Sequence, residues 1–94
     1  MNVDVEIYMN NIVKFFRDNQ KDLLNLVPKN KEQEFYNKIR ETAIENAEKG
    51  TEISLTRKQL LDICVELNPK STKQVDYHDE RVFREGIYGM ICLN

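Results

Sequence analysis

The sequence predicts a mainly α-helical fold, a small bundle of three to four helices. Apolar residues recur at intervals of three and four over most of residues 3–67, which is the period of an amphipathic helix. Polar residues that commonly cap helices precede these stretches, and Pro28, Gly50 and Pro69 follow them. The predicted helices span residues 3–18 with an extension to 26, residues 31–49, residues 56–67 and, in one of two interpretations, residues 72–84.

Length and composition indicate one domain, residues 1–94, that is large enough to fold alone. Charged residues make up 32% of the chain and hydrophobic residues 40%, which is ordinary for a small soluble protein and too apolar for disorder. The net charge of −2 is evenly spread, because residues 1–50 carry 8 basic and 9 acidic side chains and residues 51–94 carry 6 and 7. A chain without a basic arm has no evident source of attraction to nucleic acid or anionic membrane.

Three features bear on location. Because the longest apolar runs have four or five residues, we expect no membrane-spanning segment. The first ten residues lack the basic and apolar regions of a secretory signal. Cys64 and Cys92 both lie among apolar neighbours, which favours reduced, buried thiols over a disulfide. The sequence therefore predicts a cytoplasmic protein, or one of the host-cell interior if its source is viral.

The first predicted helix carries its apolar residues on one face. They are Val5, Tyr8, Met9, Ile12, Val13, Phe15 and Phe16. The same period continues beyond Asn19, which leaves two interpretations. Either the helix runs on to about Leu26, or it breaks and restarts with Asn19 as its cap. Pro28 ends it in both cases.

The next two helices have clear start and stop signals. Asn30 and Gln33 have the spacing of a capping box before residues 31–49, and Gly50 follows where a glycine commonly ends a helix. Thr56 and Gln59 have the same spacing at the start of TRKQLLDICVEL. Because apolar residues extend around much of this third helix, residues 56–67, we expect it at the centre of the molecule, surrounded by the others.

Two further segments have a different pattern. Residues 51–55 alternate between polar and apolar, and residues 87–93 form an apolar stretch with a preference for strands. They either pair as a short two-stranded β ribbon packed on the helices or cover the core as extended loops. Residues 72–84 are either a fourth helix or an irregular, solvated connection.

Few side chains suggest chemistry. His78 is the only histidine, and no spacing typical of a metal site or a phosphate-binding glycine loop occurs. Cys64 and His78 are the only Cys/His pair at modest separation, but Cys64 lies on an apolar helical face, where burial raises the pKa of a thiol. We therefore expect no catalytic residues, no metal, no cofactor and no enzymatic activity.

Arg57 and Lys58 occupy the first turn of the third helix, where cations oppose the helix dipole. This placement suggests contact with an anion, either a carboxylate of a partner or a phosphate. Residues 56–84 superficially resemble a helix-turn-helix. This resemblance gives an alternative function, that of a nucleic-acid-binding regulator. In a helix-turn-helix, the three acidic residues at positions 76–80 would face the phosphates of the nucleic acid. Their repulsion from the phosphates disfavours this alternative.

The leading hypothesis is a small helical protein that acts through protein–protein contacts, as an adaptor or as a self-associating structural or accessory protein. Its apolar side chains exceed what three short helices obviously cover, and exposed aromatic residues favour an interface. The candidate interface aromatics are Tyr36, Tyr77, Phe83 and Tyr88. The expected partner is another protein or a second copy, and a two-fold homodimer is the commonest closed assembly.

Overall fold

Helices make up most of the described structure. The computed structural model describes residues 2–50, 52–69 and 88–92. In chain order its elements are α1 (Asn2–Asp18), α2 (Gln20–Leu26), the 3-10 turn η1 (Lys29–Lys31), α3 (Glu32–Glu48), α4 (Arg57–Leu67) and α6 (Tyr88–Ile91). The mainly helical prediction is confirmed, and the predicted helices 3–18, 31–49 and 56–67 each end within one residue of an observed helix.

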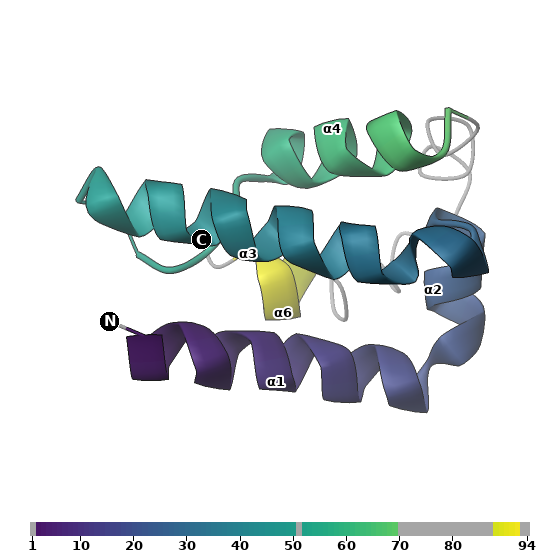
Figure 1. Cartoon of the computed structure of the whole chain (residues 1–94), viewed down its shortest axis with the longest axis horizontal. Helices are drawn as coiled ribbons and strands as arrows, with labels where there is room; N and C mark the ends of the chain where they lie inside the picture. The colour runs from purple at the N-terminus through teal and green to yellow at the C-terminus, as the bar shows by residue number, and fades with distance from the viewer. Residues whose placement is uncertain (1, 51, 70–87, 93–94) are drawn as a thin grey trace.

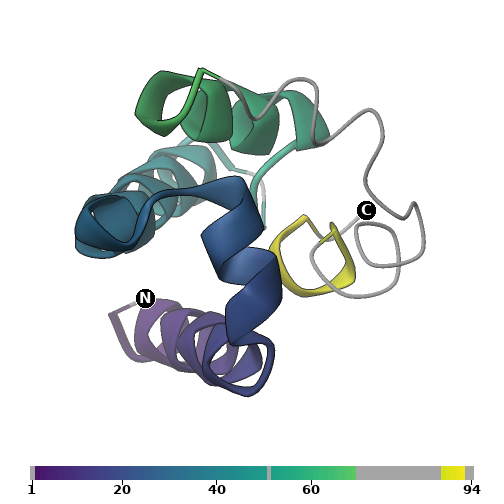
Figure 2. The ribbon, with the colours of Figure 1, turned by 90° about the vertical axis from the view of Figure 1, so that its right-hand side faces the viewer.

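The three long helices pack side by side with α3 in the middle. α1 lies antiparallel along one side of α3, and α4 lies antiparallel along the other side (Figure 1). α2 crosses the end at which α1 stops and α3 starts. Viewed along the long axis, α6 faces α3 across the core, between α1 and α4 (Figure 2). The core is therefore enclosed by α1, α3, α4 and α6, with α2 covering one end.

The prediction that residues 56–67 form the central helix is wrong. Leu60 and Cys64 of α4 are fully buried, but Val65 is 37% exposed and Leu61 is only half-buried. α4 packs against α3 through one apolar face. Leu61 and Val65 lie at the margin of that face, which is why they are partly exposed. α4 is an outer helix, and among the three long helices it is α3 that lies between the other two.

The chain breaks at Asn19, so the second interpretation of this region is confirmed. Asn19 has φ −127° and ψ 52°, outside the helical range, and α2 begins at the next residue. The Asn19 side chain does not cap α2. Its amide instead donates a 2.9 Å hydrogen bond to the carbonyl of Phe15, which also accepts a 3.0 Å bond from the backbone N–H of Asn19. Pro28 follows α2 in extended conformation, as predicted.

The start of α3 differs from the prediction, whereas its end agrees. Asn30 lies inside η1, and Lys31, at the capping position, makes no side-chain capping hydrogen bond. The capping box predicted for Asn30 and Gln33 is wrong because the chain after Pro28 first makes a 3-10 turn. At the other end Gly50 has a φ of +92°, a conformation that glycine adopts readily and that ends the helix.

An aromatic cluster joins α1 to α3 in the core. The ring of Phe16 lies 5.8 Å from that of Phe35 and 5.3 Å from that of Phe15, both in edge-to-face arrangement. Phe16 and Phe35 are fully buried, and Tyr36 extends the cluster with its ring 6.4 Å from that of Phe16. This cluster fixes how α1 and α3 sit against each other, and so positions the groove between them.

The predicted β pairing of residues 51–55 with residues 87–93 is wrong. Tyr88–Ile91 is a helical turn, and no strand occurs among the described residues. A helical turn brings Tyr88 and Ile91, three positions apart, toward the same side, whereas a strand points them to opposite faces. The two segments do meet through one backbone hydrogen bond, from the N–H of Leu55 to the carbonyl of Ile91 at 3.2 Å. The alternative helix at 72–84 lies outside the described residues.

Candidate functional site

An open groove of about 340 Å³ runs between α1 and α3. Its apolar floor consists of Met9 and Val13 from α1 and Tyr36 from α3. The groove and α6 lie on different sides of α1, because Met9 lines the groove whereas the hydroxyl of the preceding residue, Tyr8, bonds to Ile91. The antiparallel packing of the two helices creates this groove, and the aromatic cluster beneath it holds its floor in place.

The walls of the groove are polar. Asn10, Gln33 and Asn37 contribute amide groups, all from exposed residues, and the amide of Gln33 donates a 3.1 Å hydrogen bond to Asn37 Oδ1. Glu6 of α1 and Arg40 of α3 form an ion pair that joins the two walls. The groove therefore combines an apolar floor with groups that donate and accept hydrogen bonds.

Tyr36, one of the predicted interface aromatics, belongs to the floor and is only 8% exposed. Its hydroxyl donates a long hydrogen bond of 3.5 Å to the Glu32 carboxylate. Burial, and then the charge of Glu32, raise the pKa of Tyr36 to about 12. The hydroxyl therefore keeps its proton near neutral pH, where it donates that proton to Glu32 and is not a base for the groove.

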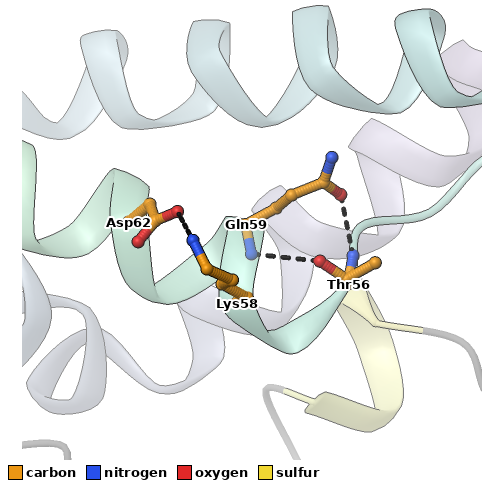
Figure 3. A network of polar contacts seen from close by, with 4 residues as sticks. All are labelled: Thr56, Lys58, Gln59 and Asp62. Atoms are coloured by element: carbon orange, nitrogen blue, oxygen red, sulfur yellow. Dashed lines mark hydrogen bonds and ion pairs between the residues drawn. The ribbon is translucent and has the colours of Figure 1, made fainter.

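The two predicted anion contacts have partners within the chain. Lys58 Nζ lies 3.1 Å from the carboxylate of Asp62, one turn further along α4 (Figure 3). The Arg57 guanidinium lies over the ring of Tyr88, 4.7 Å from its centroid, and so connects the start of α4 with α6. Both cations are exposed. Their contact with an external anion stays a prediction.

A polar network fixes the start of α4. Thr56 Oγ1 accepts a 3.1 Å hydrogen bond from the Gln59 N–H, and Gln59 Oε1 accepts one of 2.9 Å from the Thr56 N–H (Figure 3). These two bonds confirm the predicted capping box. Gln59 and Asn46 also exchange amide hydrogen bonds of 2.8 and 3.2 Å, and Asn46 donates to the Ser54 carbonyl at 2.8 Å. The network therefore joins α3, the connection and α4.

The remaining predicted site residues divide into two groups. Tyr88 is half-buried beside Arg57. Tyr77 and Phe83, and the histidine His78, lie outside the described residues.

Both cysteines are free and buried, as predicted. Burial, and to a lesser degree the neighbouring Cys92, raise the pKa of the Cys64 thiol to about 12. Burial raises the pKa of Cys92 to about 11, although the charge of Arg57 acts in the opposite direction. Both groups are protonated near neutral pH, so in this conformation neither is a ready nucleophile.

We expect the fold to lose stability as the pH rises above about 9. An unfolded cysteine titrates near ~8.5, whereas Cys64 in the fold holds its proton up to about pH 12. The pKa of Cys64 is higher in the folded state than in the unfolded state. The protonated thiol therefore stabilises the fold fully at neutral pH, and this stabilisation is lost as the pH rises from the unfolded pKa toward the folded pKa. The slope for one such group reaches ~1.4 kcal/mol per pH unit. Urea unfolding, followed by circular dichroism between about pH 8 and about pH 10, measures this slope. A Cys64→Ala variant should show a shallower fall, and an equal fall in both chains contradicts the assignment.

Sequence reasoning named Tyr36 as a candidate interface residue but missed the polar residues that form the walls of the groove. Glu6 and Arg40 lie 34 positions apart, and each has only the character of an ordinary exposed polar residue on its own helix. The spacing within one helix shows which residues face outward, but not which outward residues of two helices become neighbours. Glu6 and Arg40 could be identified as neighbours only if it were known that α1 and α3 pack antiparallel.

Other kinds of site find no support in the described residues. Within residues 2–50, 52–69 and 88–92, no group of three or more His, Cys, Asp or Glu side chains is placed to hold a metal ion. None of the helices in this part of the chain combines the length and the apolar character needed to cross a membrane. The chain matches no protein-family model, no curated protein and no solved structure.

Proposed function

We propose that this chain is a small helical protein that acts through protein–protein contacts, without catalysis, and that its partner is a second copy of itself. The observation that carries the proposal is the open, amphipathic groove between α1 and α3. An apolar floor between amide walls resembles the surface that a protein side chain or helix covers when it docks.

The shape and chemistry of the groove favour a protein over a small molecule. Sites for small molecules usually enclose roughly 70–90% of the ligand and are mainly apolar. This groove is open, and Asn10, Gln33, Asn37 and Arg40 along its walls are all exposed. Its tyrosine floor supplies no acid or base that titrates near neutral pH. These features support docking rather than catalysis.

A second copy fits the groove because the lining is compatible with itself. It carries both signs of charge, in Glu6, Glu32 and Arg40, and three amides that each donate and accept hydrogen bonds. Two α1/α3 pairs facing each other across a two-fold axis form a four-helix arrangement, which is a common way to bury such faces. A net charge of −2 per chain adds little repulsion.

The nucleic-acid alternative has less support. Lys58 is paired with Asp62, and Glu66, which is exposed on the same helix, pairs with Lys38 at 3.0 Å. The described part of α4 therefore presents mixed charge instead of a positive stripe, and phosphate backbones bind poorly to such a surface.

Sedimentation equilibrium from about 1 to about 200 µM tests the dimer, since a weak but specific self-association falls in this range. We expect the average mass to rise from that of one chain toward that of two. Asn10→Arg places a long cation in the groove that Arg40 also lines and should weaken association by about tenfold or more.

The matched control is Asn11→Arg, the same substitution at the neighbouring exposed residue, which does not line the groove. It should leave the dissociation constant unchanged. A mass of one chain at every concentration, or equal weakening by the two substitutions, overturns the proposal.

A further inference from the structure

One helix of the groove, α1, carries the most exposed apolar side chain of the described structure. α1 lies at one edge of the row of three long helices, with α3 on its inner side (Figure 1). Ile7 of α1 is 55% exposed, compared with 46% for Leu24 and 37% for Val65, the other exposed large hydrophobic residues in the described part of the chain. An unburied isoleucine therefore stands on the same helix as the apolar floor of the groove.

Ile7 borders the groove. Residues three and four positions apart are neighbours on the surface of a helix. Ile7 precedes Asn10 by three positions, and Val13 and Lys14 follow Asn10 by three and four. Glu6, Asn10 and Val13 line the groove. Glu6, Ile7, Asn10, Val13 and Lys14 thus form one continuous stripe along α1, called here the α1 stripe, in which Val13 is half-buried and the others are exposed.

The α1 stripe is arranged symmetrically about Asn10. α1 extends over 17 residues, Asn2–Asp18, so Asn10 is its midpoint. When two α1 helices pair antiparallel with Asn10 at the centre, residues equally far before and after Asn10 lie opposite each other. Ile7 then faces Val13 of the second copy, and Glu6 faces Lys14. A two-fold axis repeats each contact, so the stripe is its own complement over a helix about 25 Å long.

The charges of the stripe favour this pairing. Lys14 is exposed and makes no ion pair with any residue in the described part of the chain. Glu6 pairs with Arg40 in its own chain, but its side chain is 51% exposed, and a carboxylate accepts several hydrogen bonds. It can therefore accept one from Lys14 of a second copy as well. A parallel pair in the same register instead places each charge beside an identical one, which is repulsive.

We propose that two copies associate through antiparallel α1 helices centred on Asn10. Ile7 of each copy packs on Val13 of the other and covers part of the apolar floor, to which Val13 belongs. Glu6 of each copy pairs with Lys14 of the other. The two Asn10 amides meet at the axis, where each can donate and accept a hydrogen bond. This arrangement rests on the proposed function and identifies the residues that select the partner and its register.

The apolar contact is tested by Ile7→Ala. Ile7 is exposed in the single chain, so the substitution should leave the circular dichroism spectrum unchanged. It should weaken association in sedimentation equilibrium by about tenfold, because the dimer loses two buried side chains. Leu24→Ala is the matched control, since Leu24 is also exposed but belongs to α2 and does not line the groove. Equal effects of the two substitutions contradict the arrangement.

The register is tested by two charge reversals, Glu6→Lys and Lys14→Glu. Each alone places like charges opposite each other at both ends of the pair and should weaken association by about tenfold. Glu6→Lys cancels the net charge of −2, so repulsion between whole chains cannot account for its effect. In a mixed dimer of the two variants, opposite charges meet at both ends. An equimolar mixture should therefore associate about as tightly as the native chain.

Asp4→Lys is the control for charge, because Asp4 is an exposed carboxylate of α1 outside the α1 stripe. It should leave the dissociation constant unchanged. If the native chain dimerises but the mixture is no tighter than the two variants alone, this arrangement is wrong and the proposed function stands. A native chain that stays monomeric at every concentration overturns the proposed function and the arrangement with it.

Discussion

Replacing Phe16 with alanine is expected to lower the free energy of unfolding by about 3–5 kcal/mol. Phe16 is fully buried and its ring contacts three others, so the substitution leaves a cavity where α1 meets α3. A domain of this size has a total stability of only about 5–15 kcal/mol, so the substitution should remove a large part of it. Urea unfolding followed by circular dichroism measures the loss.

The neighbouring residue provides the control. Phe15 is only half-buried, and its ring contacts Phe16 at the edge of the cluster. Phe15→Ala should therefore cost about 1–2 kcal/mol, because less apolar surface is lost and water can enter the space. Equal losses for the two substitutions contradict the central role given to Phe16.

Replacing Gln59 with alanine should cost about 2 kcal/mol, a large effect for a polar residue near the surface. The substitution removes half of the capping box with Thr56. It also leaves the part-buried Asn46 amide without the two hydrogen bonds that it exchanges with Gln59. One side chain therefore supports both the start of α4 and its attachment to α3.

A double-mutant cycle with Asn46→Ala separates the two roles. The coupling between residues 46 and 59 should be about 1 kcal/mol, because either substitution alone already breaks the amide pair. Gln33→Ala, which removes an exposed glutamine bonded only to Asn37 among the described contacts, should change stability by less than about 0.5 kcal/mol. Additive effects of the 46 and 59 substitutions argue against the amide pair as the link between α3 and α4.

The features that the sequence predicted correctly depend on residues close together in the chain. The capping box of Thr56 joins residues three positions apart, and Gly50 ends α3 through its own backbone conformation. The apolar period of α1 and α3 is likewise a local property. Helix ends and buried faces could therefore be predicted, with the exception of Asn30, where a 3-10 turn precedes α3.

The features that could not be predicted depend on residues far apart. Tyr8 and Ile91 are 83 positions apart, and no local pattern shows that a tyrosine hydroxyl holds the last turn of the chain. Which large apolar side chains stay exposed could not be predicted either. Among the described residues, α2 and α6 bury side chains such as Leu23 and Ile91, and the exposed large hydrophobic residues are Ile7, Leu24 and Val65, on three different helices.

The turn after α3 requires a left-handed backbone conformation at Gly50, and space for a side chain does not limit it. Gly50 has a φ of +92°, yet a Cβ atom built there meets nothing within 4 Å. An L-amino acid is disfavoured at this position only by its own backbone preference, since no neighbour stands in its way. A D-alanine has the mirror-image preference, so a synthetic chain that carries it keeps the turn while restricting the freedom of the unfolded state.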